Sequence, residues 1–422
     1  NPLVKKENKM VKKISPLAPK SFPKVPDIKG VKIGTAKSGV KYKGRNDIFT
    51  AIFDKGTSVA GVFTQSKIPA EPVNFCKKNI VDGKAKALVV NAGFANAFTG
   101  VKGKKINKSI SSNVKKILKC NEKDIFICST GVIGEQIPLR PTNKSITQSL
   151  RNSSSNWKDC SKAITTTDTF PKASGRKIMI DDQEVSLAGI AKGSGMISPN
   201  MATMLAFIFT DAAIDNRVLQ TLLNLELRNS FNAITVDGDT STNDTVLVFA
   251  TGQAMKENGG KVISRTGDPR LIQFREAFSE IMHDLAIQIV RDGEGATKLI
   301  HIKVSGAENS SSAKKIARSV ADSPLVKTAV GASDPNWGRI IMAIGKTKEI
   351  IQPKKINLKI GKNLILKNGE VSRSYSETRT KKYMNGDEIL IDINLGLGKG
   401  ESDIWTCDLT EGYIRINADY RS

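Results

Sequence analysis

The sequence predicts a loop-rich protein of the α/β or α+β class with at least two lobes. Its 422 residues, of which 39% are hydrophobic, exceed the length that a single hydrophobic core usually serves. Short apolar stretches typical of strands alternate with amphipathic stretches typical of helices, and glycines separate them. Because apolar runs recur throughout the chain, we expect any disorder to be local.

The first 29 residues differ in composition from the rest of the chain. They are rich in lysine and contain five prolines that would interrupt a helix: Pro2, Pro16, Pro19, Pro23 and Pro26. We therefore predict that residues 1–29 form a flexible basic leader without a chemical role. The segment also carries Glu7 and Asp27 and favours lysine over arginine, unlike a typical transit peptide.

The segment after the leader predicts packed strands and a helix. Turn residues bound three apolar runs that we expect to be strands, at 48–53, 59–63 and 87–90. The apolar spacing over residues 109–118 predicts a helix. Residues 125–128 predict a buried strand that runs into a turn at Ser129, Thr130 and Gly131, where backbone N–H groups would be exposed.

The second half of the chain repeats this alternation. Residues 204–210 form a nearly continuous apolar run, and a helix is expected over 215–231, capped by Asp215. The most regular helix is expected over 269–290, with a proline near its first turn and a glycine just beyond its end. Strands are expected to dominate from Ile356 onwards.

The net charge of +24 raises the question of a nucleic-acid partner, because counterion release rewards a dense basic surface. The lysines are scattered over the whole chain, and no stripe of them alternates with aromatic residues. We therefore favour attraction of small anionic metabolites and predict no nucleic-acid partner.

The cysteines and the hydropathy pattern predict a cytoplasmic protein. Five cysteines without close pairs argue against a disulfide framework and a zinc knuckle, and fit a reducing compartment. No apolar run approaches the length of about 18 residues that a membrane span needs. We predict no export signal and no membrane anchor.

Histidine is scarce, which restricts the chemistry. The chain contains only His283 and His301, so most hydrolase templates and histidine-ligated metal sites are excluded. We assign neither histidine a role and predict no metal and no cofactor. A nucleophile in this chain must therefore be activated in some other way.

The most unusual stretch is the glycine-rich segment 192–205, which leads into an apolar run. It could be an ordinary loop that enters a strand, or a phosphate-binding loop, although the full spacing of such a loop is missing. The functional alternative is self-cleavage before Thr203. The hydroxyl of Thr203 would attack the preceding carbonyl, and hydrolysis would then leave a free α-amine on the same residue. With a reference pKa of about 7.7–8.0, that amine can accept the hydroxyl proton.

This segment resembles the processing signature of the ornithine acetyltransferase family, also called glutamate N-acetyltransferase. The matching string runs from Lys192 to Leu205, Lys-Gly-Ser-Gly-Met-Ile-Ser-Pro-Asn-Met-Ala-Thr-Met-Leu. Further blocks agree with the family in order, and together they cover nearly everything after the leader: 61–64, 91–97, 129–134, 166–169, 235–244, 291–298, 334–340 and 413–422.

The resemblance implies a two-lobed fold with mixed sheets and a self-processed N-terminal threonine. Cleavage between Ala202 and Thr203 would give an α chain, residues 30–202, and a β chain, residues 203–422. Two copies of each chain would form a heterotetramer. The family transfers an acetyl group from N-acetylornithine to glutamate through an acetyl-threonine intermediate, as a step of arginine biosynthesis.

The resemblance also implies roles for individual residues. Thr130 and Gly131 match the oxyanion hole, and the absence of a Cβ at Gly131 would let its N–H approach the substrate. The positions that match substrate-binding residues are Thr166, Lys192, Thr203, Glu294, Asn417 and Ser422. Lys192 would pair with a carboxylate and Glu294 with the ornithine ammonium. Ser422 stands where the family often has threonine, and it preserves the hydroxyl.

Two alternatives to this function stay open. An N-terminal-nucleophile aminopeptidase would use the same threonine chemistry but pass the acyl group to water. A basic nucleic-acid-binding protein would show strongly salt-dependent binding and no self-cleavage. The sequence also leaves open whether acetyl-coenzyme A serves as a second donor, which would add amino-acid N-acetyltransferase activity. For a binding role of Asn417 and Ser422 the C-terminal tail must dock, and we expect Ile414, Ile416 and Tyr420 to anchor it.

Overall fold

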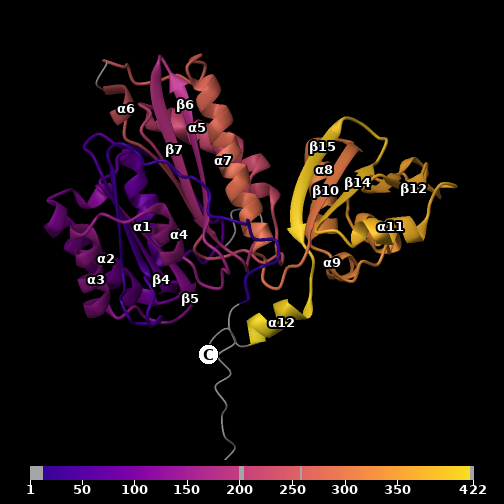
Figure 1. Ribbon diagram of the computed structural model, residues 1–422, viewed down its shortest axis with the longest axis horizontal. Helices are drawn as coiled ribbons and strands as arrows, with labels where there is room; N and C mark the ends of the chain where they lie inside the picture. Colours follow the sequence, from indigo (N-terminus) through magenta and orange to yellow (C-terminus); the bar gives the residue numbers. More distant parts are fainter. Residues whose placement is uncertain (1–12, 199–203, 257–258, 419–422) are drawn as a thin grey trace, which may run out of the picture.

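The computed structural model describes residues 13–198, 204–256 and 259–418, and Figure 1 shows that they form two lobes. The larger lobe contains a four-stranded and a five-stranded sheet, and the smaller lobe contains a six-stranded sheet. Each sheet combines parallel and antiparallel neighbours. The prediction of a two-lobed α/β protein with mixed sheets is therefore confirmed.

The two sheets of the larger lobe pack face to face. The four-stranded sheet has the order β1 (Val31–Ala36), β2 (Ile48–Phe53), β4 (Ala87–Phe94) and β5 (Ile125–Val132). The five-stranded sheet has the order β3 (Ser58–Phe63), β9 (Thr245–Ala250), β8 (Leu205–Thr210), β7 (Gln183–Lys192) and β6 (Lys172–Ile180). One core cluster joins them, in which the rings of Phe53 and Phe249 have centroids 4.3 Å apart.

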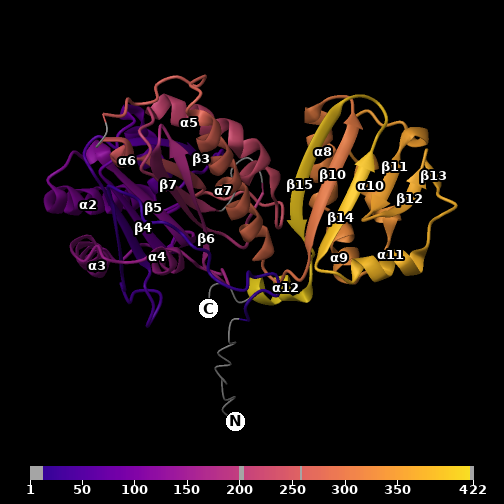
Figure 2. The ribbon, with the colours of Figure 1, turned by 45° about the horizontal axis from the view of Figure 1, so that its top comes forward.

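Helices cover the outer faces of both sheets, so the larger lobe has four layers (Figure 2). The four-stranded sheet is covered by α2 (Gly100–Leu118) and α3 (Leu139–Arg151), and the five-stranded sheet by α5 (Asn216–Glu226) and α7 (Leu271–Arg291). The shorter helices of this lobe are α1 (Glu71–Asn79), α4 (Trp157–Ala163) and α6 (Gln253–Lys256). Since β8 and β9 are buried on both faces, their sequences are continuous apolar runs instead of alternating ones.

The smaller lobe packs helices against its six-stranded sheet. The strands run in the order β13 (Glu370–Val371), β12 (Asn363–Lys367), β11 (Asn357–Ile360), β14 (Glu388–Asn394), β10 (Leu299–Ala307) and β15 (Gly400–Cys407). The helices are α8 (Ser310–Ala321), α9 (Pro324–Gly331), α10 (Trp337–Gly345) and α11 (Glu377–Met384). After β15 the chain returns toward the larger lobe and forms α12 (Glu411–Ala418), which Figure 2 shows below the ends of α7 and β6.

The boundary between the lobes differs from the predicted boundary between the two chains. The junction of residues 202 and 203 falls between β7 and β8. These two strands are antiparallel neighbours, with Leu187 opposite Thr210 at one end and Lys192 opposite Leu205 at the other. The lobes separate about 100 residues later, where β10 begins at Leu299. A break after Ala202 would therefore divide one sheet of the larger lobe, not two lobes.

The predicted flexible leader differs from the structure for residues 13–29. Leu17 is buried in the core under the five-stranded sheet, and Ile28 is buried between the two sheets. The Ser15 hydroxyl donates to the carbonyl of Arg291 at 2.6 Å, and the Trp157 indole donates to the carbonyl of Pro26 at 2.9 Å. The prolines prevent a helix but not packing in an extended form. Residues 1–12 lie outside the described residues.

Most of the predicted elements are confirmed, with differences at their ends. The predicted strands at 48–53, 59–63 and 87–90 correspond to β2, β3 and β4, and Asp215 caps α5 through the N–H of Arg217. After α5 the chain continues as short 3₁₀ turns at Leu227–Asn229 and Phe231–Ala233. The other 3₁₀ turns are Ile80–Asp82, Glu122–Asp124 and Pro353–Lys355.

The predicted start of one helix needs correction. Helix α2 begins at Gly100, nine residues before its predicted start. Its apolar face extends back only to Ile106, and polar contacts hold the turn before it. The Asn96 side chain there donates to the carbonyl of Gly103 and to the side chain of Asn107. The prediction that strands dominate from Ile356 onwards is confirmed by β11 to β15, although α11 and α12 interrupt them.

Candidate active site

Thr130 and Gly131 lie within strand β5 and not in the turn that we predicted. The strand extends to Val132 and runs parallel to β4, with Thr130 opposite Ala92 and Gly131 opposite Gly93. The two residues therefore occupy the carboxyl end of a parallel strand pair. Ligands of open α/β sheets commonly bind in the crevice beyond this end.

Gly131 is required by its contact with the neighbouring strand. Its φ is +135°, which residues with a Cβ rarely adopt. A Cβ placed on Gly131 would lie 2.1 Å from the carbonyl carbon of Gly93 in β4. The structure thus supplies a reason for glycine that the sequence did not reveal, the contact with β4, and the approach of the Gly131 N–H to a substrate stays a prediction.

Lys192 ends strand β7 and points into the space beside β5. Its side chain is 3% exposed, and its ammonium donates to the hydroxyls of Thr130 at 3.2 Å and Thr166 at 3.0 Å. Burial lowers the pKa of Lys192, and the nearby carboxylate of Asp168 opposes this shift. A lysine so placed can bind an anion, because an ammonium has three donors.

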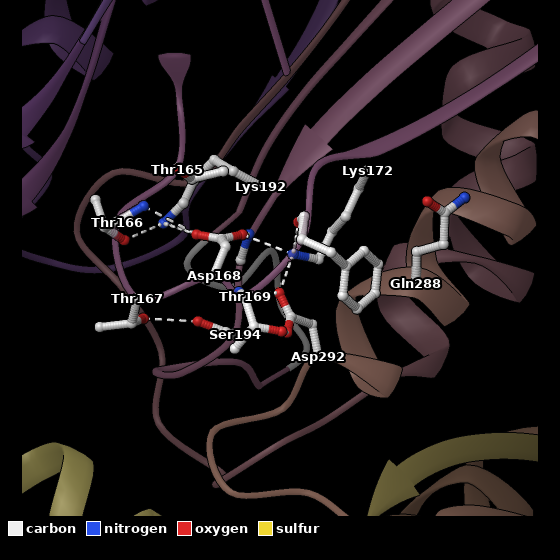
Figure 3. A network of polar contacts seen from close by, with 12 residues as sticks. Thr165, Thr166, Thr167, Asp168, Thr169, Lys172, Lys192, Ser194, Gln288 and Asp292 are labelled. Carbon is white, nitrogen blue, oxygen red and sulfur yellow. Dashed lines mark hydrogen bonds and ion pairs between the residues drawn. The ribbon is translucent and has the colours of Figure 1, made fainter. Parts of the chain in front are cut away.

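Asp168 connects Lys192 to a buried ion network, which Figure 3 shows. Its carboxylate accepts hydrogen bonds from the backbone N–H of Thr166 at 3.0 Å and of Gly193 at 2.7 Å. It also forms an ion pair with Lys172, whose ammonium is shared with Asp292. The segment after α4 is thereby tied to the ends of β7 and α7.

Glu294 follows α7 and faces the same space. It is 6% exposed, and its backbone N–H donates to the carbonyl of Ser194 at 2.9 Å. Burial raises the pKa of the Glu294 carboxyl, although a hydrogen bond from Asn417 at 2.7 Å lowers it. A Cβ on Gly195 would lie 2.4 Å from the Glu294 carboxyl group, so a larger residue at this position would displace the Glu294 side chain.

The C-terminal segment docks on the larger lobe through polar side chains of α12. Asn417 contacts Glu294, and the Tyr413 hydroxyl donates to Asp237 at 3.1 Å. Of the three predicted anchors, Ile414 is 68% exposed and does not anchor the helix, Ile416 is half-buried, and Tyr420 lies outside the described residues. The helical turn of α12 directs Ile414 away from the lobe while Tyr413 and Asn417, one turn apart, face it.

One small cavity, of about 100 Å³, brings these side chains together. All six predicted site residues that the structure describes line it: Thr130, Gly131, Thr166, Lys192, Glu294 and Asn417. They come from β5, the loop after α4, β7, the loop after α7, and α12. The remaining predicted site residues, Ala202, Thr203 and Ser422, lie outside the described residues.

Asp244 holds the chain just after the predicted cleavage point. Its carboxylate accepts a hydrogen bond from the N–H of Met204 at 3.0 Å, and its second oxygen has no partner among the described residues. Burial raises the pKa of Asp244 well above the usual range. The adjacent Asn243 lines the cavity and donates to the carbonyls of Ala95 and Ser129, which links the two sheets.

The described part of the chain contains no group of three histidine, cysteine, aspartate or glutamate residues that could hold a metal ion. His283 and His301 pack against Trp405 and do not line the cavity. No helix among the described residues is long and apolar enough to cross a membrane. The polar side chains that line the cavity carry hydroxyl, ammonium, carboxylate and amide groups.

A model of the ArgJ family matches residues 32–422. The chain belongs to the ArgJ family. A curated relative from Brucella suis, named "Arginine biosynthesis bifunctional protein ArgJ", is 47% identical over 97% of this chain and 99% of its own length. A relative of the same name from Agrobacterium fabrum is 48% identical over the same shares. The family resemblance recognised in the sequence is thereby confirmed.

Solved structures of similar proteins include an ArgJ protein from Bacillus halodurans, 44% identical, which covers 50% of this chain and 97% of its own. Its TM-score is 0.47. An ornithine acetyltransferase from Mycobacterium tuberculosis, complexed with ornithine, is 24% identical and covers 41% of this chain and 92% of its own, with a TM-score of 0.36.

Sequence reasoning assigned no role to several residues around the cavity. Thr167, Met196, Ser241, Thr242 and Asn243 line it, and Asp168 and Asp244 stand just behind it. The available signal was the position of most of them within the blocks 166–169 and 235–244 that match the ArgJ family. A sequence block marks such residues as a group, but only their contacts separate the lining side chains from the supporting ones.

Proposed function

We propose that this ArgJ-family chain cleaves itself between Ala202 and Thr203 and then transfers the acetyl group of N-acetylornithine to glutamate. The observation that carries the proposal is the convergence of six predicted residues, from five separate segments, on one cavity. The near full-length match to ArgJ relatives supports the same reaction class.

Cleavage would begin when the Thr203 hydroxyl attacks the carbonyl of Ala202. The peptide bond is replaced by an ester, and the proton passes to the nitrogen of Thr203. Water then hydrolyses the ester, which leaves a carboxylate on Ala202 and a free α-amine on Thr203. Met204, the residue bonded to Thr203, is held by Asp244, so the chain is anchored on the C-terminal side of the junction.

Acetyl transfer would use the same hydroxyl. Its oxygen attacks the amide carbon of N-acetylornithine, and the α-amine of Thr203 takes the hydroxyl proton. That proton then passes to the leaving nitrogen, which releases ornithine and leaves an acetyl ester on Thr203. The α-amine of glutamate attacks this ester, and its proton returns to the threonine oxygen, so that N-acetylglutamate leaves and the enzyme is restored.

The remaining residues would stabilise charges during these steps. Thr130 and Gly131, at the end of β5, would donate hydrogen bonds to the oxyanion that forms on the acetyl carbonyl. Lys192 would bind the substrate carboxylate, and Glu294 would pair with the side-chain ammonium of ornithine. Thr166, Asn417 and Ser422 would complete the binding of the ligand.

The proposal treats residues 30–202 and 203–422 as separate chains after cleavage. The pairing of β7 with β8 supports their continued association, since these strands lie on either side of the junction. We propose a heterotetramer with two copies of each chain, acting in the cytoplasm. Because the relatives are named bifunctional, we include acetyl-coenzyme A as a second acetyl donor.

The test combines intact-mass analysis with an acetyl-transfer assay. The purified protein should give two fragments that meet at the junction of residues 202 and 203, whereas the Thr203→Ala variant should stay uncut. N-Acetylornithine should be consumed only when glutamate is present. Glutamate-independent release of acetate would assign the cavity to a hydrolase, and an uncut but active protein would overturn the threonine mechanism.

A further inference from the structure

The starting observation is an ion network, buried behind the cavity, that the proposed mechanism does not use. The side chains of Asp168, Lys172 and Asp292 are all 0% exposed. Lys172 lies 2.7 Å from Asp168 and 2.5 Å from Asp292, and it also donates to the carbonyl of Phe170 at 3.4 Å. Burying charges is costly unless they are paired and hydrogen bonded, so a complete network at this site calls for a reason.

Among the side chains that the structure describes, the ammonium of Lys172 hydrogen bonds directly to carboxylates, whereas the ammonium of Lys192 does not. The three donors of the Lys172 ammonium are matched by two carboxylates and a carbonyl. Lys192 donates to two threonine hydroxyls, and the nearest carboxylate oxygen among the described residues, Oδ2 of Asp168, is 3.9 Å away. Charge-assisted hydrogen bonds are usually about 2.7–2.9 Å long. At 3.9 Å, Asp168 therefore attracts the Lys192 ammonium electrostatically but does not form a hydrogen bond with it.

Asp168 is fixed in this position by its other partners. Its Oδ1 atom accepts from Lys172 and from the N–H of Gly193, both at 2.7 Å, and its Oδ2 atom accepts from the N–H of Thr166. Figure 3 shows the carboxylate between Lys172 and Lys192. Gly193 directly follows Lys192 in the chain, so Asp168 also holds the backbone from which Lys192 extends.

We propose that Asp168 and Lys172 are positioning residues that keep the Lys192 ammonium charged yet free to bind the carboxylate of the substrate. This inference rests on the proposed function and adds the support of its anion-binding group. Asp168 supplies the negative charge that a buried ammonium needs. Lys172 forms an ion pair with the same carboxylate, so that Asp168 does not form a direct hydrogen bond with Lys192.

The charges around Lys192 agree with opposite effects of Asp168 and Lys172 on its ammonium. Burial lowers the pKa of Lys192, and the opposing groups are Asp168 first, then Glu294 and Asp244. Lys172 is the cation that adds to the lowering. Removing Asp168 should therefore lower the pKa of Lys192 further, and removing Lys172 should raise it.

Lys172 also links the two sides of the proposed cleavage point. Asp168 and Lys192 precede the cleavage point in the sequence, while Asp292 follows the cleavage point and lies two residues before Glu294. Asp292 additionally accepts hydrogen bonds from the N–H and hydroxyl of Thr169. A single cation thus contacts the segments that carry Lys192 and Glu294, the two charged groups that the proposed function assigns to substrate binding.

The test compares the parent with Asp168→Asn and Lys172→Met, and uses Lys177→Gln as control. Lys177 lies on the same strand, and its side chain is 55% exposed in a surface pair with Glu184. The pKa of Lys192 is read from the pH dependence of its labelling by acetic anhydride, measured by peptide mass spectrometry, which requires no enzyme activity. KM and kcat are measured with N-acetylornithine and glutamate.

We expect the labelling midpoint to move down by about one pH unit in Asp168→Asn and up by about one in Lys172→Met. KM should rise about tenfold in both variants while kcat stays within about threefold, because binding of the carboxylate is weakened in each. Lys177→Gln should match the parent. Equal midpoints, or shifts in the same direction, would overturn the inference.

The test also covers a variant that does not fold and a parent protein that lacks acetyl-transfer activity. If Lys172→Met does not fold because two buried carboxylates lose their cation, Asp168→Asn decides alone, since it leaves one cation paired with Asp292. An unchanged midpoint in that variant overturns the inference. A parent without acetyl transfer would overturn the proposed function, whereas the order of the labelling midpoints would still test the network.

Discussion

Replacing Gly131 with alanine tests whether the backbone contact between β4 and β5 shapes the cavity. The φ of +135° alone should cost about 1–3 kcal/mol with a side chain present. The new Cβ would also lie 2.1 Å from the carbonyl carbon of Gly93, closer than the 3.0 Å below which real Cβ contacts essentially do not occur. Overpacking of this kind adds about 1–3 kcal/mol, so we expect a total of about 2–6 kcal/mol.

Gly134→Ala is the matched control for this prediction. Gly134 also has a positive φ, +83°, but no atom lies within 4 Å of a Cβ placed there. It should therefore lose only the conformational part, about 1–3 kcal/mol. Urea unfolding of both variants, at equal m-value, isolates the contribution of the strand contact.

The same substitution should reduce activity by displacing the end of β5. Relief of the contact requires β4 and β5 to separate by nearly 1 Å, and a misplacement of about 1 Å at a reacting group can cost about 100-fold in rate. We expect kcat/KM for acetyl transfer to fall about 100- to 1,000-fold in Gly131→Ala, and less than tenfold in Gly134→Ala. Equal stability and equal activity of the two variants would refute the reasoning.

Two further predictions concern pH. Asn417→Ala removes a hydrogen-bond donor that lowers the pKa of Glu294. The acid limb of the pH profile of kcat/KM for N-acetylornithine should therefore move to higher pH. An acid limb at the same pH would argue against pairing of Glu294 with the substrate. Because burial raises the folded pKa of Asp244, its protonated form favours folding, and this contribution is lost as pH rises from about 4 through the folded pKa. Asp244→Asn should therefore be more stable than the parent at pH 8, with the difference shrinking toward pH 4 in urea titrations, and a constant difference would contradict it.

Local sequence determines those parts of the fold in which one segment carries its own signal. The apolar face and flanking residues of 269–290 predicted α7, and continuous apolar runs predicted buried strands such as β8. The start of α2 was missed because its apolar face reaches back only to Ile106, while polar contacts around Asn96 and Gly103 hold the residues before it. The docking of Leu17 was missed because a proline-rich segment has the same composition whether it packs or stays free.

The candidate residues could be named from sequence blocks, but their assembly could not be derived from them. Whether Thr130, Thr166 and Lys192 meet depends on how β5, the loop after α4 and β7 are placed, and no spacing along the chain contains that information. The same is true of Asn417, which reaches Glu294 only because α12 returns to the larger lobe.

The sequence by itself determined the class of fold, the family and the residue types available for chemistry, because these follow from composition, periodicity and ordered motifs. Only the tertiary structure decided that Gly131 is needed for contact with β4, and that Lys172 forms an ion pair with Asp168 behind Lys192. The physical reason is that electrostatic and steric interactions act over a few ångströms in space, between groups that the chain separates by tens of residues.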